Sequence, residues 1–330
     1  MGLLYPYDAS SAVRALNEDN EFARDVYSGL TAPQKVLAAR YLYNEVGSAL
    51  FEAITLLPEY GLTRAEERLL LAHADDIAER LAPVEMVAEL GSGGGRKTQP
   101  ILEGITRRQQ NVDYFAIDVS NAALQLCKEH LRDVKGVRAY TLQNSYLDGL
   151  ARVCHARPHH GRMLLLFLGS TIGNFSISET EKFLKRVRAS LRPGDGFLLG
   201  ADLVKSSDQL LKAYDDPAGV TAAFNKNLLS RINLELDGDF RLNRFRHEAR
   251  WRSDEQRIEM HLVSLGRQSV TVAGANCRAS FYEDESIWTE SSQKFTLSAL
   301  QDMARKAAFV PAAHWIDQEW PFAESLWIAE

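Results

Sequence analysis

A glycine-rich turn directly after an apolar run is the feature that most limits how this chain can fold. The run 86–88 leads into Glu89-Leu90-Gly91-Ser92-Gly93-Gly94-Gly95, the pattern of a strand that ends in an acidic residue and a turn. Glycines there let the backbone approach a ligand where any side chain would intrude. A dinucleotide fingerprint needs its third glycine at position 96, which is Arg96. The spacing therefore favours S-adenosylmethionine as the cofactor, and an ordinary strand-to-helix turn is the alternative.

A second strand with an acidic end follows the turn. Residues 114–119 read Tyr-Phe-Ala-Ile-Asp-Val, which places Asp118 near the carboxyl end of the next strand of a βαβ unit. A carboxylate at that edge is suited to hold a ribose diol. Asp118 could instead cap the helix that begins after Ser120. Its distance from the glycine turn favours the ribose role.

Strand and helix patterns alternate from residue 86 to residue 203. Apolar spacing predicts a helix over 63–81, and the continuous apolar run 163–168 is typical of a central strand that is buried on both faces. Ser178, with Glu181 three residues later, predicts a capping box at the start of a helix that ends at Leu191. The other predicted elements are helices over 97–108, 121–132 and 297–307, and strands over 137–142, 196–203, 310–316 and 324–330. This order predicts an α/β fold with a doubly wound, Rossmann-like sheet.

The sheet pattern is interrupted by about 90 residues of different character, from Lys205 to Phe295. This stretch reads as helical over 208–236 and then as strands over 246–251, 257–265, 269–272 and 286–295. We expect it to form a second α+β lobe together with the N-terminal residues. The predicted domains are therefore 64–204 with 296–330, and 1–63 with 205–295.

Composition excludes several classes of protein. Of the 330 residues, 45% are hydrophobic and 25% are charged, and the net charge of −6 argues against a sequence-independent grip on nucleic acid. No apolar run reaches the length of a membrane span, and the N-terminus lacks the pattern of a secretory signal. Cys127, Cys154 and Cys277 are odd in number and widely spaced, which suits a reducing cytoplasm and offers no zinc site. His155, His159 and His160 are expected in a surface loop, and no metal is expected.

Several stretches in both predicted domains are distinctive enough to indicate a family. They are Leu57-Pro58-Glu59-Tyr60, residues 167–174 (Phe-Leu-Gly-Ser-Thr-Ile-Gly-Asn), residues 213–221 (Ala-Tyr-Asp-Asp-Pro-Ala-Gly-Val-Thr), residues 222–227 (Ala-Ala-Phe-Asn-Lys-Asn) and residues 289–295 (Thr-Glu-Ser-Ser-Gln-Lys-Phe). In this order they resemble the histidine-specific Nα-methyltransferases of ergothioneine biosynthesis. The resemblance runs from about residue 25 to the C-terminus. It implies a class I methyltransferase sheet with a substrate-binding lobe, and three methyl transfers from S-adenosylmethionine to the α-nitrogen of L-histidine, giving hercynine.

The resemblance also implies roles for single residues. Cofactor-binding positions are Gly91, Gly93, Lys97, Asp118, Ser145 and Tyr146. Positions that hold the amino and carboxylate groups of the substrate are Tyr60, Asn174 and Tyr214, those that grip the imidazole are Glu290 and Ser292, and Tyr43 and Phe51 add aromatic surface. The family commonly has an acidic residue near the adenine where this chain has Ser145, and a second tyrosine where it has Gly61. No general base is required, because methyl transfer from a sulfonium depends mainly on positioning.

Each assignment has a structural alternative. Asn174 could be a turn residue, Tyr214 and Phe51 could be packed aromatics, and Glu290 could be a solvated strand residue. A carboxylate would accept an imidazole N–H at about 1.5–3 kcal/mol, whereas an aromatic substrate would prefer apolar contacts. The alternative functions are Nα-methylation of a different free amino acid and a catalytically silent binding module. We expect a monomer that acts on a small molecule.

Overall fold

The chain folds into two compact units, each built from two separate segments. The computed structural model describes residues 20–158 and 161–330, so His159 and His160 lie outside the described residues. Unit 1 comprises the described residues up to Tyr60 and Ser207–Ser291, and unit 2 comprises Gly61–Ser206 and Ser292–Glu330. The sequence placed the boundaries after residues 63, 204 and 295. Each unit is described by itself below.

Unit 2 contains a seven-stranded sheet. Its order is β12 (Phe309–Asp317), β13 (Phe322–Ala329), β6 (Gly196–Asp202), β5 (Arg162–Phe167), β2 (Val84–Leu90), β3 (Val112–Asp118) and β4 (Val137–Gln143). The five strands from β6 to β4 pair in parallel, and β13 runs antiparallel to both β6 and β12. The predicted doubly wound α/β sheet is confirmed. Its central strands form from continuous apolar runs because both of their faces are covered.

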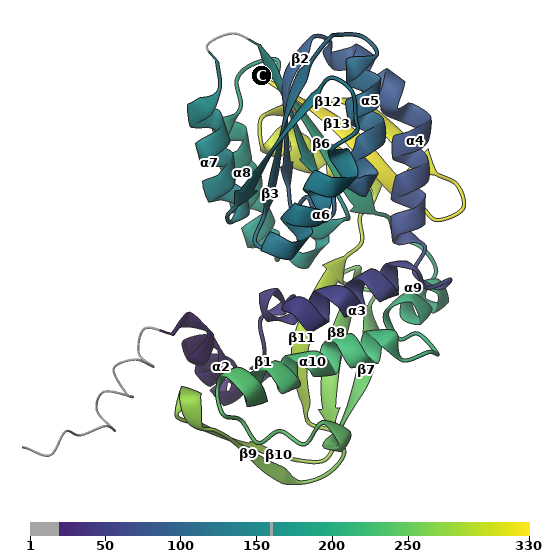
Figure 1. Ribbon diagram of the computed structural model, residues 1–330. Coiled ribbons are helices and arrows are strands. Elements are labelled where there is room, and N and C mark those ends of the chain that lie inside the picture. The colour runs from purple at the N-terminus through teal and green to yellow at the C-terminus, as the bar shows by residue number, and fades with distance from the viewer. Residues whose placement is uncertain (1–19, 159–160) are drawn as a thin grey trace, which may run out of the picture. The chain divides into compact units, whose positions relative to one another are not determined.

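Helices cover both faces of this sheet (Figure 1). On one face lie α4 (Leu62–Leu81), α5 (Gln99–Thr106) and α6 (Asn121–Leu131), and on the other lie α7 (Tyr146–Ala156), α8 (Ile177–Ser190) and α11 (Leu297–Lys306). The core beneath α7 and α8 contains Met86, Ala88 and Leu90, alternate residues of β2. This period of two is what a strand needs to present one apolar set to each face. Because the five strands from β6 to β4 run parallel, their carboxyl ends all lie at one edge of the sheet.

Two local predictions in unit 2 are wrong. Helix α8 begins two residues earlier than expected, because Ser176 caps it and forms the capping box with Glu179. The sequence offers the same serine-to-glutamate spacing at Ser176 and at Ser178, so spacing alone did not decide between them. His155 belongs to the last turn of α7 and not to a loop.

Unit 1 is an α+β unit. Its main sheet has the order β1 (Lys35–Val36), β11 (Ser286–Gln293), β8 (Arg257–Ser264) and β7 (Phe245–Arg252), and β9 (Gln268–Val272) pairs with β10 (Cys277–Phe281) as a separate antiparallel ribbon. The helices are α2 (Glu21–Thr31), α3 (Glu45–Thr55), α9 (Ser207–Tyr214) and α10 (Val220–Glu235), with short 3₁₀ turns η1 (Ala39–Leu42), η4 (Leu242–Arg244) and η5 (Ala273–Ala275). Helix α10 packs on α3 and on strands β7 and β8 (Figure 1).

The continuous helical stretch expected over 208–236 is wrong. It is two helices, α9 and α10, separated at residues 215–219. Pro217 cannot extend a helix through its missing N–H, and Gly219 adopts φ +76°, which favours glycine. Asp216 accepts hydrogen bonds from the first free N–H groups of α10, at Val220 (3.0 Å) and Thr221 (2.7 Å). The break therefore starts a second, well-capped helix.

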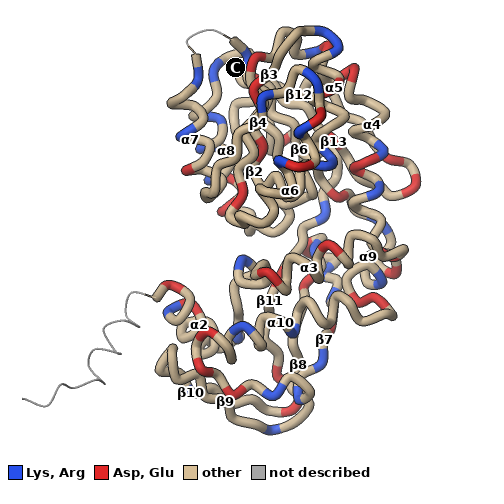
Figure 2. Tube along the Cα trace, in the orientation of Figure 1, with Lys and Arg blue, Asp and Glu red and all other residues tan. Residues whose placement is uncertain are grey.

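Charged residues of both signs are interspersed along both units (Figure 2). Within residues 20–158 and 161–330, no helix combines the length and the apolar character needed to cross a membrane.

Candidate functional site

The glycine turn of unit 2 has the backbone that the sequence predicts. Gly91, Gly93 and Gly95 adopt φ values of +75°, +51° and +70°, in the region that side chains disfavour. The N–H of Gly91 donates to the carbonyl of Ile117 (2.8 Å), so the turn is fixed to the end of β3. A methyl group at Gly93 would meet no described atom within 4 Å, whereas one at Gly91 would come within 3.2 Å of the Tyr146 ring. The turn therefore exposes backbone beside open space at Gly93 and beside an aromatic ring at Gly91.

Beneath the turn, Glu89 is a buried carboxyl group at the end of β2. It accepts hydrogen bonds from the hydroxyls of Thr98 (2.6 Å) and Tyr114 (2.5 Å). Burial raises the pKa of Glu89 to about 7, although both hydrogen bonds act to lower it. Glu89 thus ties the strand end to the first turn after the glycines, and it does so from inside the core.

Asp118 lies at the end of β3 and braces the same turn. One oxygen accepts from the N–H of Gly93 (3.0 Å) and the other accepts from the N–H of Ser120 (2.8 Å). The helix cap itself is Ser120, whose hydroxyl accepts from Ala123 N–H (3.2 Å). Each carboxylate oxygen keeps a further lone pair for a ligand. Asp118 is therefore both a local brace and an available acceptor.

Lys97 and Tyr146 flank the turn from two other elements. Lys97, in the 3₁₀ turn η2 (Arg96–Thr98), pairs with the buried Glu66 of α4 and keeps 29% of its side chain exposed. Burial alone would lower the pKa of Lys97, but the Glu66 carboxylate beside it raises the pKa, so the lysine is a cation. Burial and the Asp118 carboxylate raise the pKa of Tyr146 to about 12, so its phenol is neutral. A cation, a neutral phenol and a carboxylate thus surround open backbone, which fits a ligand with carboxylate, ring and diol groups.

Ser145 is engaged locally as the N-cap of α7. Its hydroxyl donates to the Asp148 carboxylate (2.7 Å) and accepts from Asp148 N–H (3.4 Å). A contact from Ser145 to adenine remains a prediction.

Asn174 lies at the end of a tight loop that follows β5. The loop begins with Gly169 at φ +75° and Ser170 at φ +55°, and the 3₁₀ turn η3 (Thr171–Asn174) completes it. A methyl group at Gly173 would come within 2.8 Å of the carbonyl of Gln293, so only glycine fits beside that strand. This close packing places Asn174 at the carboxyl edge of the sheet, the edge at which doubly wound folds bind ligands.

In unit 1, the aromatic residues predicted for the substrate form one connected group. Tyr43 and Phe51 lie 5.5 Å apart between ring centroids, Phe51 and Tyr60 lie 6.4 Å apart, and Tyr60 and Tyr214 lie 6.0 Å apart. Phe224 of α10 contacts both Tyr43 (5.5 Å) and Phe51 (6.1 Å). Edge-on contacts at these distances are favourable for aromatic pairs. The group joins the N-terminal segment to the inserted segment.

A buried histidine supports the backbone of Tyr214. His247 of β7 donates from Nε2 to the carbonyl of Tyr214 (2.8 Å), and its Nδ1 accepts from the amide of Asn225 (2.9 Å). Only 1% of the His247 side chain is exposed, and burial lowers its pKa, so the ring is neutral. The two hydrogen bonds define one tautomer and fix the end of α9.

Glu290 and Ser292 both lie in β11, and the boundary between the units falls between them. Glu290 belongs to unit 1 and is 9% exposed, which contradicts the reading of a solvated strand residue. Its carbonyl accepts from the indole N–H of Trp288 (2.8 Å). Ser292 belongs to unit 2, is also buried, and accepts from the Lys294 ammonium (2.9 Å).

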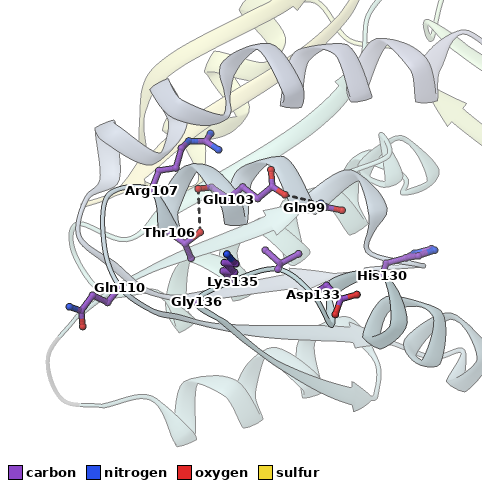
Figure 3. A pocket seen from close by; sticks show the side chains of 10 residues that line it. Gln99, Glu103, Thr106, Arg107, Gln110, His130, Asp133, Lys135 and Gly136 are labelled. Carbon is purple, nitrogen blue, oxygen red and sulfur yellow. Dashed lines mark hydrogen bonds between the residues drawn. The ribbon is translucent and has the colours of Figure 1, made fainter.

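A pocket of unit 2 lies away from the glycine turn (Figure 3). It has a volume of about 520 Å³ and lies between α5 and the loop after α6, with Glu103, Arg107, His130 and Lys135 among its lining residues. Its lining residues carry charges of both signs, and Gln99 donates a hydrogen bond to Glu103 (2.8 Å) along α5. The positive-φ glycines and the strand-end carboxylates meet at the glycine turn, and a cofactor site there remains a prediction.

Comparison with known proteins identifies the family. A model for histidine-specific, S-adenosylmethionine-dependent methyltransferases matches residues 22–329. The chain belongs to this family. It is 40% identical over 304 residues to a histidine N-alpha-methyltransferase of Mycobacterium tuberculosis, covering 92% of this chain and 93% of that protein.

Two further likenesses give context to this methyltransferase. It is 35% identical over 207 residues to ergothioneine biosynthesis protein 1 of Neurospora crassa, covering 61% of this chain and 24% of that larger protein. A crystal structure of a DUF574-family protein from Streptomyces avermitilis superposes with a TM-score of 0.50 at 10% identity, covering 95% of this chain and 99% of the other. This last likeness concerns the fold alone. The methyltransferase fold and the dependence on S-adenosylmethionine expected from the sequence are confirmed.

Several residues of the methyltransferase were missed by sequence reasoning. Phe224 lies within a stretch that was singled out as distinctive, yet its ring contacts were not predicted. His247 and Glu66 carried no signal, because each acts on residues far away in the sequence. A glutamate on an amphipathic helix reads as a surface charge, and only the fold reveals that Glu66 is fully buried.

Proposed function

We propose that this chain transfers three methyl groups from S-adenosylmethionine to the α-nitrogen of L-histidine and so makes hercynine, in ergothioneine biosynthesis. Family membership carries the proposal, since the matching family is specific for histidine and covers nearly all of the chain. The relative from Mycobacterium tuberculosis, whose name states the same activity, supports it over a similar length. The ergothioneine pathway is supported by the likeness to the Neurospora crassa protein.

The proposed cofactor contacts belong to unit 2. Lys97 would pair with the carboxylate of the methionine part, Asp118 would accept from the ribose diol, and the backbone at Gly91 and Gly93 would lie against the ligand. Tyr146 and Ser145 would line the adenine side. Bound S-adenosylmethionine supplies a methyl group from its sulfonium, and the sulfur is left as a neutral thioether. The protein residues need to orient the two reactants, and orientation alone can lower the activation barrier by several kcal/mol.

The family resemblance assigns residues of each unit to histidine. In unit 1 they are Tyr60, Tyr214 and Glu290, with Tyr43 and Phe51 as aromatic surface, and in unit 2 they are Asn174 and Ser292. Glu290 is buried, with 9% of the residue exposed, and a carboxylate in such surroundings is a strong acceptor for an imidazole N–H. The aromatic group is suited to the growing quaternary ammonium, which aromatic faces attract by about 0.5–2 kcal/mol.

Methylation of a different free amino acid is the alternative activity. The proposed head-group contacts at Tyr60, Asn174 and Tyr214 would serve any α-amino acid, so the choice of substrate depends on the contacts to the side chain. Incubating the purified protein with S-adenosylmethionine and each of the twenty amino acids, and measuring the mass of the products, separates the two. A gain of three methyl groups on histidine alone is expected. Methylation of another amino acid in preference to histidine would overturn the proposal.

Glu290 provides the sharpest test of specificity. Replacing Glu290 by Ala should raise the Kd for histidine roughly tenfold to a hundredfold, because a charged hydrogen bond is worth about 1.5–3 kcal/mol, and should leave the Kd for S-adenosylhomocysteine nearly unchanged. Titration calorimetry with each ligand measures both. Glu283→Ala, which removes an exposed glutamate from the same unit, is the matched control. Equal losses of both ligands in Glu290→Ala would contradict the role given to this residue.

We also propose that the enzyme is a monomer and acts in the cytoplasm. The described cysteines Cys127, Cys154 and Cys277 are all free thiols, which suits a reducing compartment. Light scattering of the purified protein tests the monomer, for which a mass near 37.0 kDa is expected.

A further inference from the structure

The Glu66 side chain connects two parts of unit 2 that the proposed function assigns to different ligands. Glu66 projects from α4 and is fully buried. Its Oε2 accepts from the ammonium of Lys97, which belongs to the turn after β2, and its Oε1 accepts from the N–H of Gly169, which opens the loop after β5. One carboxylate therefore holds the proposed cofactor lysine and the loop that ends in Asn174.

The protein keeps space for this carboxylate. A methyl group on Gly200 of β6 would come within 2.5 Å of Glu66 Oε1 and within 3.2 Å of Glu324 Oε1. Any residue larger than glycine at position 200 would force the glutamate away from Gly169. Glycine at position 200 therefore leaves room for the Glu66 carboxylate beside Gly169.

A second buried glutamate, Glu324 of β13, reaches the same space but plays a different part. Neither of its oxygens has a hydrogen-bond partner among the described residues. Burial, followed by the Glu66 carboxylate, raises the pKa of Glu324 well above its usual range, so it is protonated and neutral. Lys97 thus has an ion-pair partner in Glu66 and a neutral neighbour in Glu324.

The loop held by Glu66 is fixed at several points. The hydroxyl of Ser170 accepts from the N–H of Asp202 (2.9 Å), and the hydroxyl of Thr171 donates to the carbonyl of Leu168 (2.9 Å). With Gly173 packed against Gln293, these contacts leave the loop little freedom to deform internally. A displacement at Gly169 would therefore be carried along the loop to Asn174.

We propose that Glu66 is a positioning residue that couples cofactor binding at Lys97 to histidine binding at Asn174. This inference rests on the proposed function. When the carboxylate of the cofactor pairs with Lys97, it shares the ammonium with Glu66 and changes how firmly Glu66 is held. Because Glu66 also holds Gly169, the loop responds, and each ligand alters the affinity for the other by the same factor.

The test is the thermodynamic coupling between the two ligands. Titration calorimetry gives the Kd for L-histidine with and without saturating S-adenosylhomocysteine. We expect the cofactor product to tighten histidine binding by about fivefold or more in the wild type, at the low end of allosteric couplings, and by less than about twofold in Glu66→Gln. A wild-type coupling that persists in full in Glu66→Gln would overturn the inference.

Four further variants separate coupling from general damage. Glu324→Gln makes a matched change in the same space to a group that is already neutral, and its coupling should equal that of the wild type. Glu66→Asp keeps the charge but shortens the reach. It should keep the affinity for S-adenosylhomocysteine within about threefold and lose the coupling, and it serves as the test if Glu66→Gln does not fold. The double variant Glu66→Gln/Lys97→Met should bind S-adenosylhomocysteine no more weakly than Lys97→Met alone, because Glu66 acts on the cofactor through the lysine.

The two proposals fail in different ways. A wild-type protein that does not methylate histidine contradicts the proposed function. A wild-type protein that methylates histidine but shows no coupling contradicts the role of Glu66 alone.

Discussion

Buried ion pairs are prominent in unit 2, whereas packed aromatic rings surround the proposed substrate residues of unit 1. Unit 2 buries charges in pairs and clusters, such as Arg157 with Asp195 at 2.6 Å and Asp202 between Lys205 (2.5 Å) and Lys294 (2.8 Å). Around its proposed substrate residues, unit 1 packs aromatic rings, of which Tyr60, Tyr214 and Phe224 are buried, beside the buried and neutral His247. Buried charge pairs fix positions sharply but leave a costly charge when one partner is lost. These pairs fix positions within unit 2, whereas the aromatic group of unit 1 offers polarisable surface.

The largest effect should come from breaking the buried pair of unit 2. Asp195 accepts from both terminal nitrogens of Arg157 and from the N–H groups of Met163 (3.0 Å) and Arg192 (2.7 Å). Asp195→Ala should cost about 3–5 kcal/mol of unfolding free energy, because it strands a buried guanidinium. Urea denaturation measures this. Asp208→Ala, in an exposed ion pair of unit 1, should change stability by no more than about 0.5 kcal/mol, and similar costs for the two variants would contradict the comparison.

A smaller effect should distinguish the units by the sign of their pH dependence. With a folded-state pKa of about 7, Glu89 holds a proton between pH 4.5 and 7 that the unfolded chain has lost, so its contribution to stability falls as the pH rises through that window. His247 has a lowered pKa, so the unfolded chain takes up the proton first and stability falls as the pH drops below 6.5.

The unfolding free energies of wild type, Glu89→Gln and His247→Gln at pH 5.5 and 7.5 test this. The unfolding free energy of the wild type minus that of Glu89→Gln should be about 2 kcal/mol larger at pH 5.5 than at pH 7.5. Relative to His247→Gln, the wild type should be less favoured at pH 5.5. If both differences move in the same direction, the contrast between the units is wrong.

The smallest effect concerns two glycines in the same conformation, one in each unit. Gly93 (φ +51°) and Gly219 (φ +76°) both face open space, with no described atom within 4 Å of an added methyl group. Replacement of either by Ala should cost about 1 kcal/mol of stability, because both are in the left-handed region. Only Gly93→Ala should also raise the Kd for S-adenosylhomocysteine, roughly tenfold, because its methyl group would occupy the proposed ligand space. Calorimetry measures the affinity of both variants for S-adenosylhomocysteine. Equal affinities would contradict a cofactor site at the glycine turn.

The sheet of unit 2 was predictable because its strands carry their own signal. Buried parallel strands are continuous apolar runs, and the glycine turn marks the end of the first one. The run 163–168 predicted β5 and residues 196–203 predicted β6, each to within one residue at either end.

Unit 1 was less predictable because its pairing partners are remote. Strand β10 was missed even though its five residues alternate between buried and exposed positions, and the two residues of β1 are too few to show a period. Strand β1 exists because it pairs with β11, more than two hundred positions away. Local pattern cannot report a contact of that kind.

The proposed site divides in the same way. Gly91, Gly93 and Asp118 follow from strand ends, and the structure brings them together. Phe224 and Glu66 depend on contacts between elements far apart in sequence, so the chain pattern alone gave no reason to choose them. Sequence reasoning finds the residues at strand ends more readily than those that support them from behind.

The position of β13 has a consequence for how the protein is made. This last strand lies between β6 and β12, and Asp202 pairs with Phe322 at one end of the β6–β13 register. During synthesis, one edge of β6 therefore stays unpaired until the inserted segment and β13 have left the ribosome. A nascent chain that stalls in that interval exposes a ready template for aggregation or for exchange of strands with another copy. Chaperones would therefore bind this chain while β6 still lacks its partner β13.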